Sequence, residues 1–361
     1  MENDIVNLMN SVLKRFSVPC LNSSFPLVDG LLKDSKKHIV IIVLDGMGSF
    51  NMQYALYTNG FFMRNKICDY YSVFPPTTVA ATASYDSALY PSQHARLGWT
   101  MHYPELNQNV EVYSNKNDDG LPAASFNAAE YYTPYVSVQE RIKKTGAEAY
   151  VLSPYGEPFI KSYDEILDKI LDLTQYGKPK YIYAYWPEPD SIMHKKGVMH
   201  PDVIKNMREL ESKTEAFALK LKNAYCFVSA DHGHIDGKGC VLSDYPDILE
   251  NLSCLPSIEP RTLNLFAKAG KKEALKKAFE AHFKDSFTLY TKEEALESEL
   301  FGRKPYNKSL EKLLGDFIAA ANTDLTIFNT VNQLKALKGV HAGNTEEEKK
   351  IPLILLQSAQ S

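Results

Sequence analysis

Aspartate and histidine residues stand at the ends of several apolar runs in this 361-residue sequence. They are Asp45, Asp190, His194, Asp231, His232 and His341. Aspartate and histidine without cysteine suit Zn²⁺ or Mn²⁺ in mixed oxygen and nitrogen coordination. One zinc ion takes three or four protein ligands, so six such groups predict two adjacent metal sites. Without metal, the three carboxylates would repel one another.

The apolar runs that carry these residues predict buried strands. The runs are residues 38–44, 149–152, 181–186, 225–230, 325–328 and 351–356, and helical patterns lie at about 4–16, 136–145, 163–174, 202–222 and 271–284. This alternation predicts an α/β/α sandwich with a largely parallel central sheet. Because sites in such sheets form beyond the carboxyl ends of the strands, the six residues should meet at one sheet edge.

A nucleophile candidate lies in the segment Phe74-Pro75-Pro76-Thr77-Thr78, which precedes a predicted helix. The free N–H groups of a helix start favour a phosphate. Metal coordination would lower the pKa of a threonine hydroxyl enough to make it nucleophilic. Both Thr77 and Thr78 are candidates, and Thr77 has the alternative role of capping the helix through its side chain.

Each of these residues also has a structural interpretation. Asp45-Gly46 alone would suit a turn, and the spacing of Asp190 and His194 also suits a surface helix. We interpret His234 and Asp236 as loop residues that at most support the ligands. We expect His102 and Arg96 at the surface. The alternatives are that His102 touches the substrate and that Arg96 points into the site, where it would serve the third oxygen of a monoester.

Composition excludes several other classes of protein. Forty basic and forty-four acidic residues give a net charge of −4, which argues against binding to a nucleic-acid scaffold. No apolar stretch reaches the ~20 residues that a bilayer span needs, and the N-terminus lacks the pattern of a signal peptide. The five cysteines form no CxxC pair. We therefore expect a cytoplasmic enzyme with reduced thiols and no membrane partner.

The chain organisation predicts one catalytic domain over residues 1–361 with two interruptions. Residues 97–135 are polar and aromatic, and we interpret them as a lid-like loop region. Residues 255–323 begin with two prolines and include a Lys-rich helix. We interpret this segment as a small inserted α+β subdomain.

Five motifs together resemble the alkaline phosphatase superfamily, in its type I phosphodiesterase/nucleotide pyrophosphatase branch. They are LDGMG at 44–48, FPPTT at 74–78, DSIMH at 190–194, ADHG at 230–233 and KGVHAGNTEEEKKIPLIL at 338–355. Each motif is weak alone, but their order and their positions at strand ends are specific. They extend over most of the chain.

The resemblance implies a metal-dependent phosphoric ester hydrolase with two metal ions, which in this family are usually zinc. One ion would bind Asp45, Thr78, Asp231 and His232, and the other would bind Asp190, His194 and His341. Thr78, which the family register favours over Thr77, would form a covalent phosphothreonine. A water molecule activated by the second metal would then hydrolyse this intermediate. The expected substrate is a small phosphate ester, a diester or a pyrophosphate.

Two positions depart from the nucleotide pyrophosphatase pattern. Val79 replaces the aromatic residue that usually follows the nucleophile, and residues 94–100 lack the usual asparagine. A phosphomonoesterase or phosphonate hydrolase on the same core is therefore an alternative.

A sulfatase does not fit, because residues 78–82 lack the C/S-x-P-x-R pattern. A non-catalytic binding protein is a further alternative, but all seven positions are filled. No arginine lies beside Thr78, which favours diesters over monoesters.

Overall fold

The computed structural model describes residues 3–34, 37–156 and 159–356, and its centre is a six-stranded sheet in the order β2-β16-β7-β1-β6-β5. The strands are β1 (His38–Leu44), β2 (Lys66–Tyr71), β5 (Glu148–Leu152), β6 (Lys180–Trp186), β7 (Ala224–Ser229) and β16 (Lys350–Leu356). All neighbours pair in parallel except β16, which is antiparallel to both β2 and β7. The sheet is therefore mostly parallel, as the sequence predicts.

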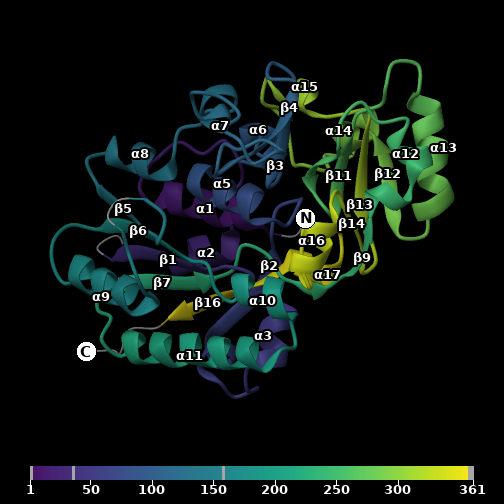
Figure 1. The fold of residues 1–361 in the computed structure, drawn as a ribbon. Coiled ribbons are helices and arrows are strands. Elements are labelled where there is room, and N and C mark those ends of the chain that lie inside the picture. The colour runs from purple at the N-terminus through teal and green to yellow at the C-terminus, as the bar shows by residue number, and fades with distance from the viewer. Residues whose placement is uncertain (1–2, 35–36, 157–158, 357–361) are drawn as a thin grey trace.

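Continuous apolar sequence explains why β1 occupies the middle of this sheet. All seven of its residues are buried, and helices cover both sheet faces (Figure 1). One side carries α1 (Ile5–Arg15), α2 (Pro26–Leu31), α5 (Thr78–Ser87) and α8 (Val138–Lys143), and the other carries α3 (Ser49–Ala55), α4 (Phe61–Asn65), α9 (Tyr163–Thr174), α10 (Asp190–Lys196) and α11 (Pro201–Ala218). The fold is thus an α/β/α sandwich.

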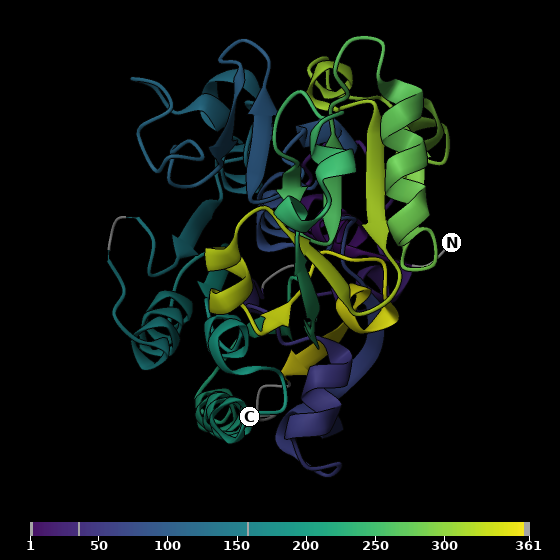
Figure 2. The same cartoon turned by 45° about the vertical axis from the view of Figure 1, so that its right-hand side comes forward.

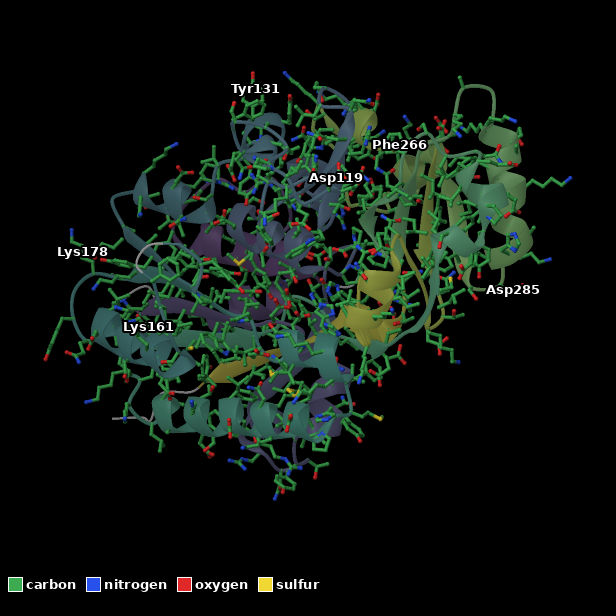
Figure 3. All side chains as sticks on the ribbon, viewed as in Figure 1. Asp119, Tyr131, Lys161, Lys178, Phe266 and Asp285 are labelled. Carbon is green, nitrogen blue, oxygen red and sulfur yellow. The ribbon has the colours of Figure 1, made fainter. Side chains whose placement is uncertain are left out.

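A second six-stranded sheet, entirely antiparallel, lies beside the first (Figure 2). It contains β3 (Thr100–Tyr103), β4 (Gln108–Glu111), β10 (Ser257–Glu259), β11 (Thr262–Leu265), β12 (Phe287–Thr291) and β13 (Phe317–Ala321). Residues 97–135 and 255–323 thus contribute strands to one common sheet. The two segments meet where Ile258 of β10 pairs with Thr100 of β3. Lys178 and Asp285, on opposite sides of Figure 3, lie beside β6 and β12 respectively.

The remaining elements are short or lie around the second sheet. The helices are α6 (Pro91–His94), α7 (Ala128–Tyr132), α12 (Pro246–Leu249), α13 (Lys272–Phe283), α14 (Lys292–Glu297), α15 (Leu310–Leu313), α16 (Val331–Ala336), α17 (Glu346–Lys349) and the 3₁₀ turn Leu242–Asp244. Two small pairs, β8 (Ile235–Asp236) with β15 (Gly339–Val340) and β9 (Lys238–Val241) with β14 (Leu325–Phe328), complete the fold. Within the described ranges, no helix has the length and apolar character to cross a membrane.

The structure corrects one predicted strand. Residues 325–328 do form a strand, β14, but it pairs with β9 and not with the central sheet. A short apolar run predicts a strand but does not indicate which sheet the strand joins. The sixth strand of the central sheet is β2, whose mixed sequence KICDYY suits a sheet edge.

Candidate metal centre

The seven predicted site residues converge at the carboxyl edge of the central sheet. Asp45 follows β1, Asp190 is the first residue of α10 after β6, and Asp231-His232 follow β7. Thr78 begins α5, and His341 directly follows β15. Parallel β1, β6 and β7 are adjacent in the sheet, so the residues after them come together although their positions in the sequence lie far apart.

The first group of candidate ligands surrounds the Nε2 atom of His232. This atom lies 3.2 Å from Thr78 Oγ1, 3.4 Å from Asp45 Oδ1 and 3.5 Å from Asp231 Oδ2. Those two carboxylate oxygens are buried and have no hydrogen-bond partner among the described residues. Ligands of a tetrahedral Zn²⁺, with bonds of about 2.0–2.2 Å, lie roughly 3.3–3.6 Å apart. The two unsatisfied oxygens therefore fit a bound cation.

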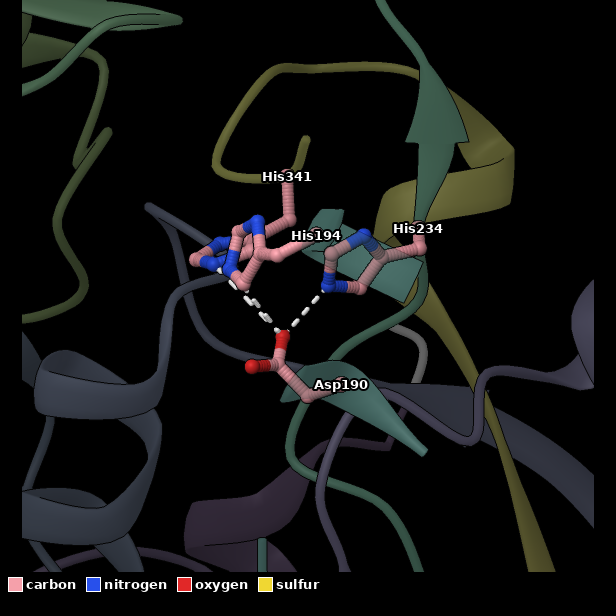
Figure 4. Close-up of side chains that lie close together, drawn as sticks. All are labelled: Asp190, His194, His234 and His341. Atoms are coloured by element: carbon pink, nitrogen blue, oxygen red, sulfur yellow. Dashed lines mark hydrogen bonds and ion pairs between the residues drawn. The ribbon is translucent and has the colours of Figure 1, made fainter. Parts of the chain in front are cut away.

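The second group surrounds Asp190 Oδ1 (Figure 4). The Nε2 atom of His194 lies 3.3 Å from this oxygen, and that of His341 lies 3.9 Å from it. His234 Nε2 hydrogen-bonds the same oxygen. The ligand atoms of all four residues lie within 4.8 Å of one another, which is close enough to share one ion.

Backbone carbonyls orient the predicted histidine ligands. His194 Nδ1 lies 2.8 Å from the oxygen of Gly339, and His232 Nδ1 lies 3.1 Å from that of Gly233. His341 Nδ1 lies 3.3 Å from the oxygen of Pro76. A hydrogen bond from Nδ1–H to each carbonyl leaves the Nε2 lone pair free, which is the arrangement typical of metal-bound histidines.

His234 belongs to the site although we interpreted it from the sequence as a loop residue. Strands β8 and β15 pair Ile235 with Val340, so the next pair in the antiparallel register is His234 with His341, and their rings are 5.0 Å apart. The side chain of Asn51 holds the backbone of His234 with two hydrogen bonds: Asn51 Oδ1 accepts from the His234 N–H, and Asn51 Nδ2 donates to the His234 carbonyl. In the structure, His234 precedes β8 and His341 follows β15, so the pairing of these two short strands brings the two histidines together. Asp236 instead accepts a hydrogen bond from the backbone of Val198.

The ionisation behaviour of the site reflects burial and crowding. Burial and the neighbouring charges of Asp190 and Asp231 raise the pKa of Asp45 well above its ordinary value. Burial acts to raise the pKa of Asp190 as well, but the histidines around it hold that pKa below its ordinary value. Burial lowers the pKa of His341. At neutral pH His341 therefore presents a neutral imidazole beside crowded carboxyls, which suits a divalent cation.

The two threonines occupy different environments. Thr78 is partly exposed, and its hydroxyl faces His232. Thr77 is fully buried, and its hydroxyl donates to Glu259 Oε1 over 2.6 Å. Thr77 occupies the N-cap position of α5, but its side chain makes no capping hydrogen bond, so it does not take the alternative role of capping this helix.

Two residues expected at the surface are buried. Arg96 is 7% exposed, pairs with Glu130 and packs 4.4 Å over the ring of Tyr135. His102 is also 7% exposed and contacts Asn109 and Phe266. Both positions lie in or beside a polar, aromatic segment. Its sequence predicts exposure, because the residues that it packs against are distant in the chain.

Comparison with known proteins gives the family context of this geometry. Residues 39–344 match the family described as "Type I phosphodiesterase / nucleotide pyrophosphatase". Venom phosphodiesterases 2 and 1 of Crotalus adamanteus are each 25% identical to the chain over 181 residues, which is 45% of this chain. The match spans only 22% and 21% of the length of these two relatives.

Solved structures share the fold. Murine ectonucleotide pyrophosphatase/phosphodiesterase 5, in an inactive variant bound to AMP, has a TM-score of 0.64 at 17% identity. The human counterpart has a TM-score of 0.70 at 14% identity. Each comparison covers 88% of this chain and 87% of the other.

Proposed function

The chain belongs to the type I phosphodiesterase/nucleotide pyrophosphatase family, and we propose that it hydrolyses phosphoric diesters or pyrophosphates through Thr78 with two divalent metal ions. The observation that carries this proposal is the pair of unsatisfied, buried oxygens of Asp45 and Asp231 beside Thr78. Uncompensated polar atoms of this kind are costly, so their presence around a partly exposed hydroxyl favours a cation-dependent nucleophile.

The ligand sets would be those implied by the family resemblance. Asp45, Thr78, Asp231 and His232 would hold one ion, and Asp190, His194 and His341 the other. His234 would orient Asp190 through its hydrogen bond. Bound ions would supply the positive charge that stabilises the ionised Thr78 hydroxyl and the transferring phosphoryl group. Zinc fits the imidazole-rich second group best, and manganese is the second choice.

The residues around Thr78 support a transfer to its hydroxyl. Thr78 is the first residue of a ten-residue helix, whose free N–H groups favour a phosphate oxygen. The Thr78 oxygen would attack phosphorus, the alcohol or phosphate leaving group would depart, and water would then cleave the phosphothreonine. The Tyr185 hydroxyl donates a hydrogen bond to Asp45 Oδ2 and holds this oxygen in place, whereas Oδ1 has no hydrogen-bond partner among the described residues.

A nucleotide is one candidate substrate, because a relative with the same fold was solved with AMP. Val79 is buried and does not offer a ring to a base. Trp99 and Tyr113 are exposed and form an edge-to-face pair, and Tyr113 bonds Thr82 one helical turn from Thr78. They are therefore the aromatic surface that a base or another apolar leaving group would contact.

A metal-loaded preparation tests the proposal directly. Bis-p-nitrophenyl phosphate should be hydrolysed by the wild-type protein and not by Thr78→Ala. The p-nitrophenyl ester of thymidine monophosphate should compete with it if nucleotides bind. Absence of diester hydrolysis after loading with either zinc or manganese would contradict the proposed function.

A further inference from the structure

Glu259 places a carboxylate beside the nucleophile. It is the last residue of β10, in the second sheet. Its Oε1 atom accepts hydrogen bonds from Thr77 Oγ1 at 2.6 Å and from the backbone N–H of Trp99 at 2.8 Å. Because Thr77 directly precedes Thr78, the hydrogen bond from Thr77 ties this carboxylate to the segment that carries the proposed nucleophile.

The position of Glu259 brings it near both halves of the metal centre. His194 from one ligand group and His232 from the other both interact electrostatically with its carboxyl. Burial raises the pKa of Glu259, whereas the hydrogen bonds from Thr77 and Trp99 act in the opposite direction. A carboxyl oxygen that accepts two hydrogen bonds is arranged for its ionised form.

Glu259 forms no ion pair with a lysine or an arginine in the described part of the chain. Two arginines close to the site in sequence or space are engaged elsewhere: Arg96 pairs with Glu130, and Arg261 pairs with Glu348. The charge of Glu259 therefore acts on whatever anion approaches Thr78.

We propose that Glu259 selects substrates by charge, and that it excludes phosphate groups with two negative charges from the site. This inference rests on the proposed function, and it names the substrate class as phosphoryl groups that carry a single negative charge. A phosphodiester has one such charge. A phosphomonoester has a second pKa of about 6 and is a dianion at pH 8. Repulsion between the additional charge of the monoester and the Glu259 carboxylate, which no lysine or arginine pairs with, raises the barrier for a monoester more than that for a diester.

The unaltered protein provides the first test. At pH 8, kcat/KM is compared for bis-p-nitrophenyl phosphate, p-nitrophenyl methylphosphonate and p-nitrophenyl phosphate. The first two carry one charge, and the second resembles the monoester in size. Charge selection predicts that the methylphosphonate reacts at least tenfold faster than the monoester. A monoester that reacts as fast as the methylphosphonate overturns the proposal.

Two substitutions then separate charge from structure. Glu259→Gln removes the charge but keeps an oxygen that accepts from Thr77 and Trp99, whereas Glu259→Asp keeps the charge. We expect the monoester-to-diester ratio of kcat/KM to rise at least tenfold in Glu259→Gln and to stay within about threefold in Glu259→Asp. Inhibition by inorganic phosphate should strengthen only in Glu259→Gln. Glu105→Gln, which removes an exposed carboxylate paired with Lys312, is the matched control and should change neither value.

The remaining outcomes are distinguishable. Equal losses on both substrates in Glu259→Gln, with an unchanged ratio, would make Glu259 a positioning residue for Thr77 and overturn charge selection. The same shift in Glu259→Asp would point to shape and also overturn it. If the metal-loaded wild-type protein hydrolyses none of the three compounds, the proposed function itself fails.

Discussion

Arg261 and Glu348 form a fully buried ion pair that joins the second sheet to the loop carrying His341. Arg261 Nε donates to Glu348 Oε1 over 2.7 Å, and a terminal guanidinium nitrogen donates to Oε2 over 2.8 Å. Both side chains are 0% exposed. The same carboxylate accepts the backbone N–H of Gly343, two residues after His341, so the pair fixes the last predicted metal ligand.

Substitution of this arginine should destabilise the protein strongly. Arg261→Met leaves Glu348 buried without its partner, which typically costs about 3–5 kcal/mol of unfolding free energy. Urea unfolding of the metal-free protein measures this loss. Lys312→Met is the control, because its exposed pair with Glu105 should contribute only about 0–1 kcal/mol. Equal losses of unfolding free energy in the two variants would show that the buried pair contributes no more to stability than the exposed one.

Loss of the proposed nucleophile should separate catalysis from folding. Thr78→Ala should lower kcat for bis-p-nitrophenyl phosphate by at least about 1000-fold, while circular dichroism stays unchanged and most of the bound metal is retained. Thr77→Ala should instead cost about 1–3 kcal/mol of stability, because Glu259 loses a buried hydrogen bond. An active Thr78→Ala protein with an inactive Thr77→Ala protein would place the nucleophile one residue earlier.

Metal content should follow the two ligand groups. We expect two divalent ions per chain by elemental analysis, complete loss of hydrolysis after extensive chelation, and recovery with zinc or manganese. Removal should also lower the melting temperature, because Asp45, Asp190 and Asp231 then repel one another. Fully active protein without a transition metal would contradict this prediction. A single bound ion would first bring the role of His341 into question.

Acid should destabilise the protein through His94, a buried histidine whose Nε2 hydrogen-bonds Ser84 of α5. Burial lowers the pKa of His94 from 6.5 to about 3, so below pH 6.5 the unfolded chain binds a proton that the folded chain does not. The neutral, buried His94 therefore contributes to the free energy of unfolding above pH 6.5. As the pH falls below 6.5, this contribution is lost by about 1.4 kcal/mol per pH unit.

The comparison that checks this is urea unfolding at pH 7, 6 and 5. His94→Gln should show a smaller loss of stability over this range than the wild-type protein. The exposed His282, which pairs with Asp247, provides the control: His282→Gln should not reduce the pH dependence. Parallel pH profiles of the wild-type protein and His94→Gln would contradict the assigned burial effect.

Sequence predicted the features that depend on neighbouring residues in the chain. The seven apolar residues of β1 and the Asp45-Gly46 that follows them are local signals, and the structure has them where the pattern places them. The direction of β16 is not local, because a strand buried on both faces has the same composition whether it runs parallel or antiparallel. The nearest neighbour of a strand is a property of the whole sheet.

Burial of polar side chains was the other feature that sequence did not reveal. Arg261 is buried because Glu348 and the carbonyls of Thr323 and Leu325 satisfy its donors, and these partners lie more than sixty residues away. The association of His234 with Asp190 likewise depends on the register of two very short strands. A charge or an imidazole is expected at the surface until its distant partners are known.

Strand β16 also has a consequence for synthesis on the ribosome. It lies between β2 and β7, so the first-made edge strand cannot join the rest of the central sheet until residues 350–356 have been translated. His341, a predicted metal ligand, is also translated only shortly before these residues. The backbone edges of β2 and β7 that pair with β16 in the finished sheet therefore stay without this partner during elongation.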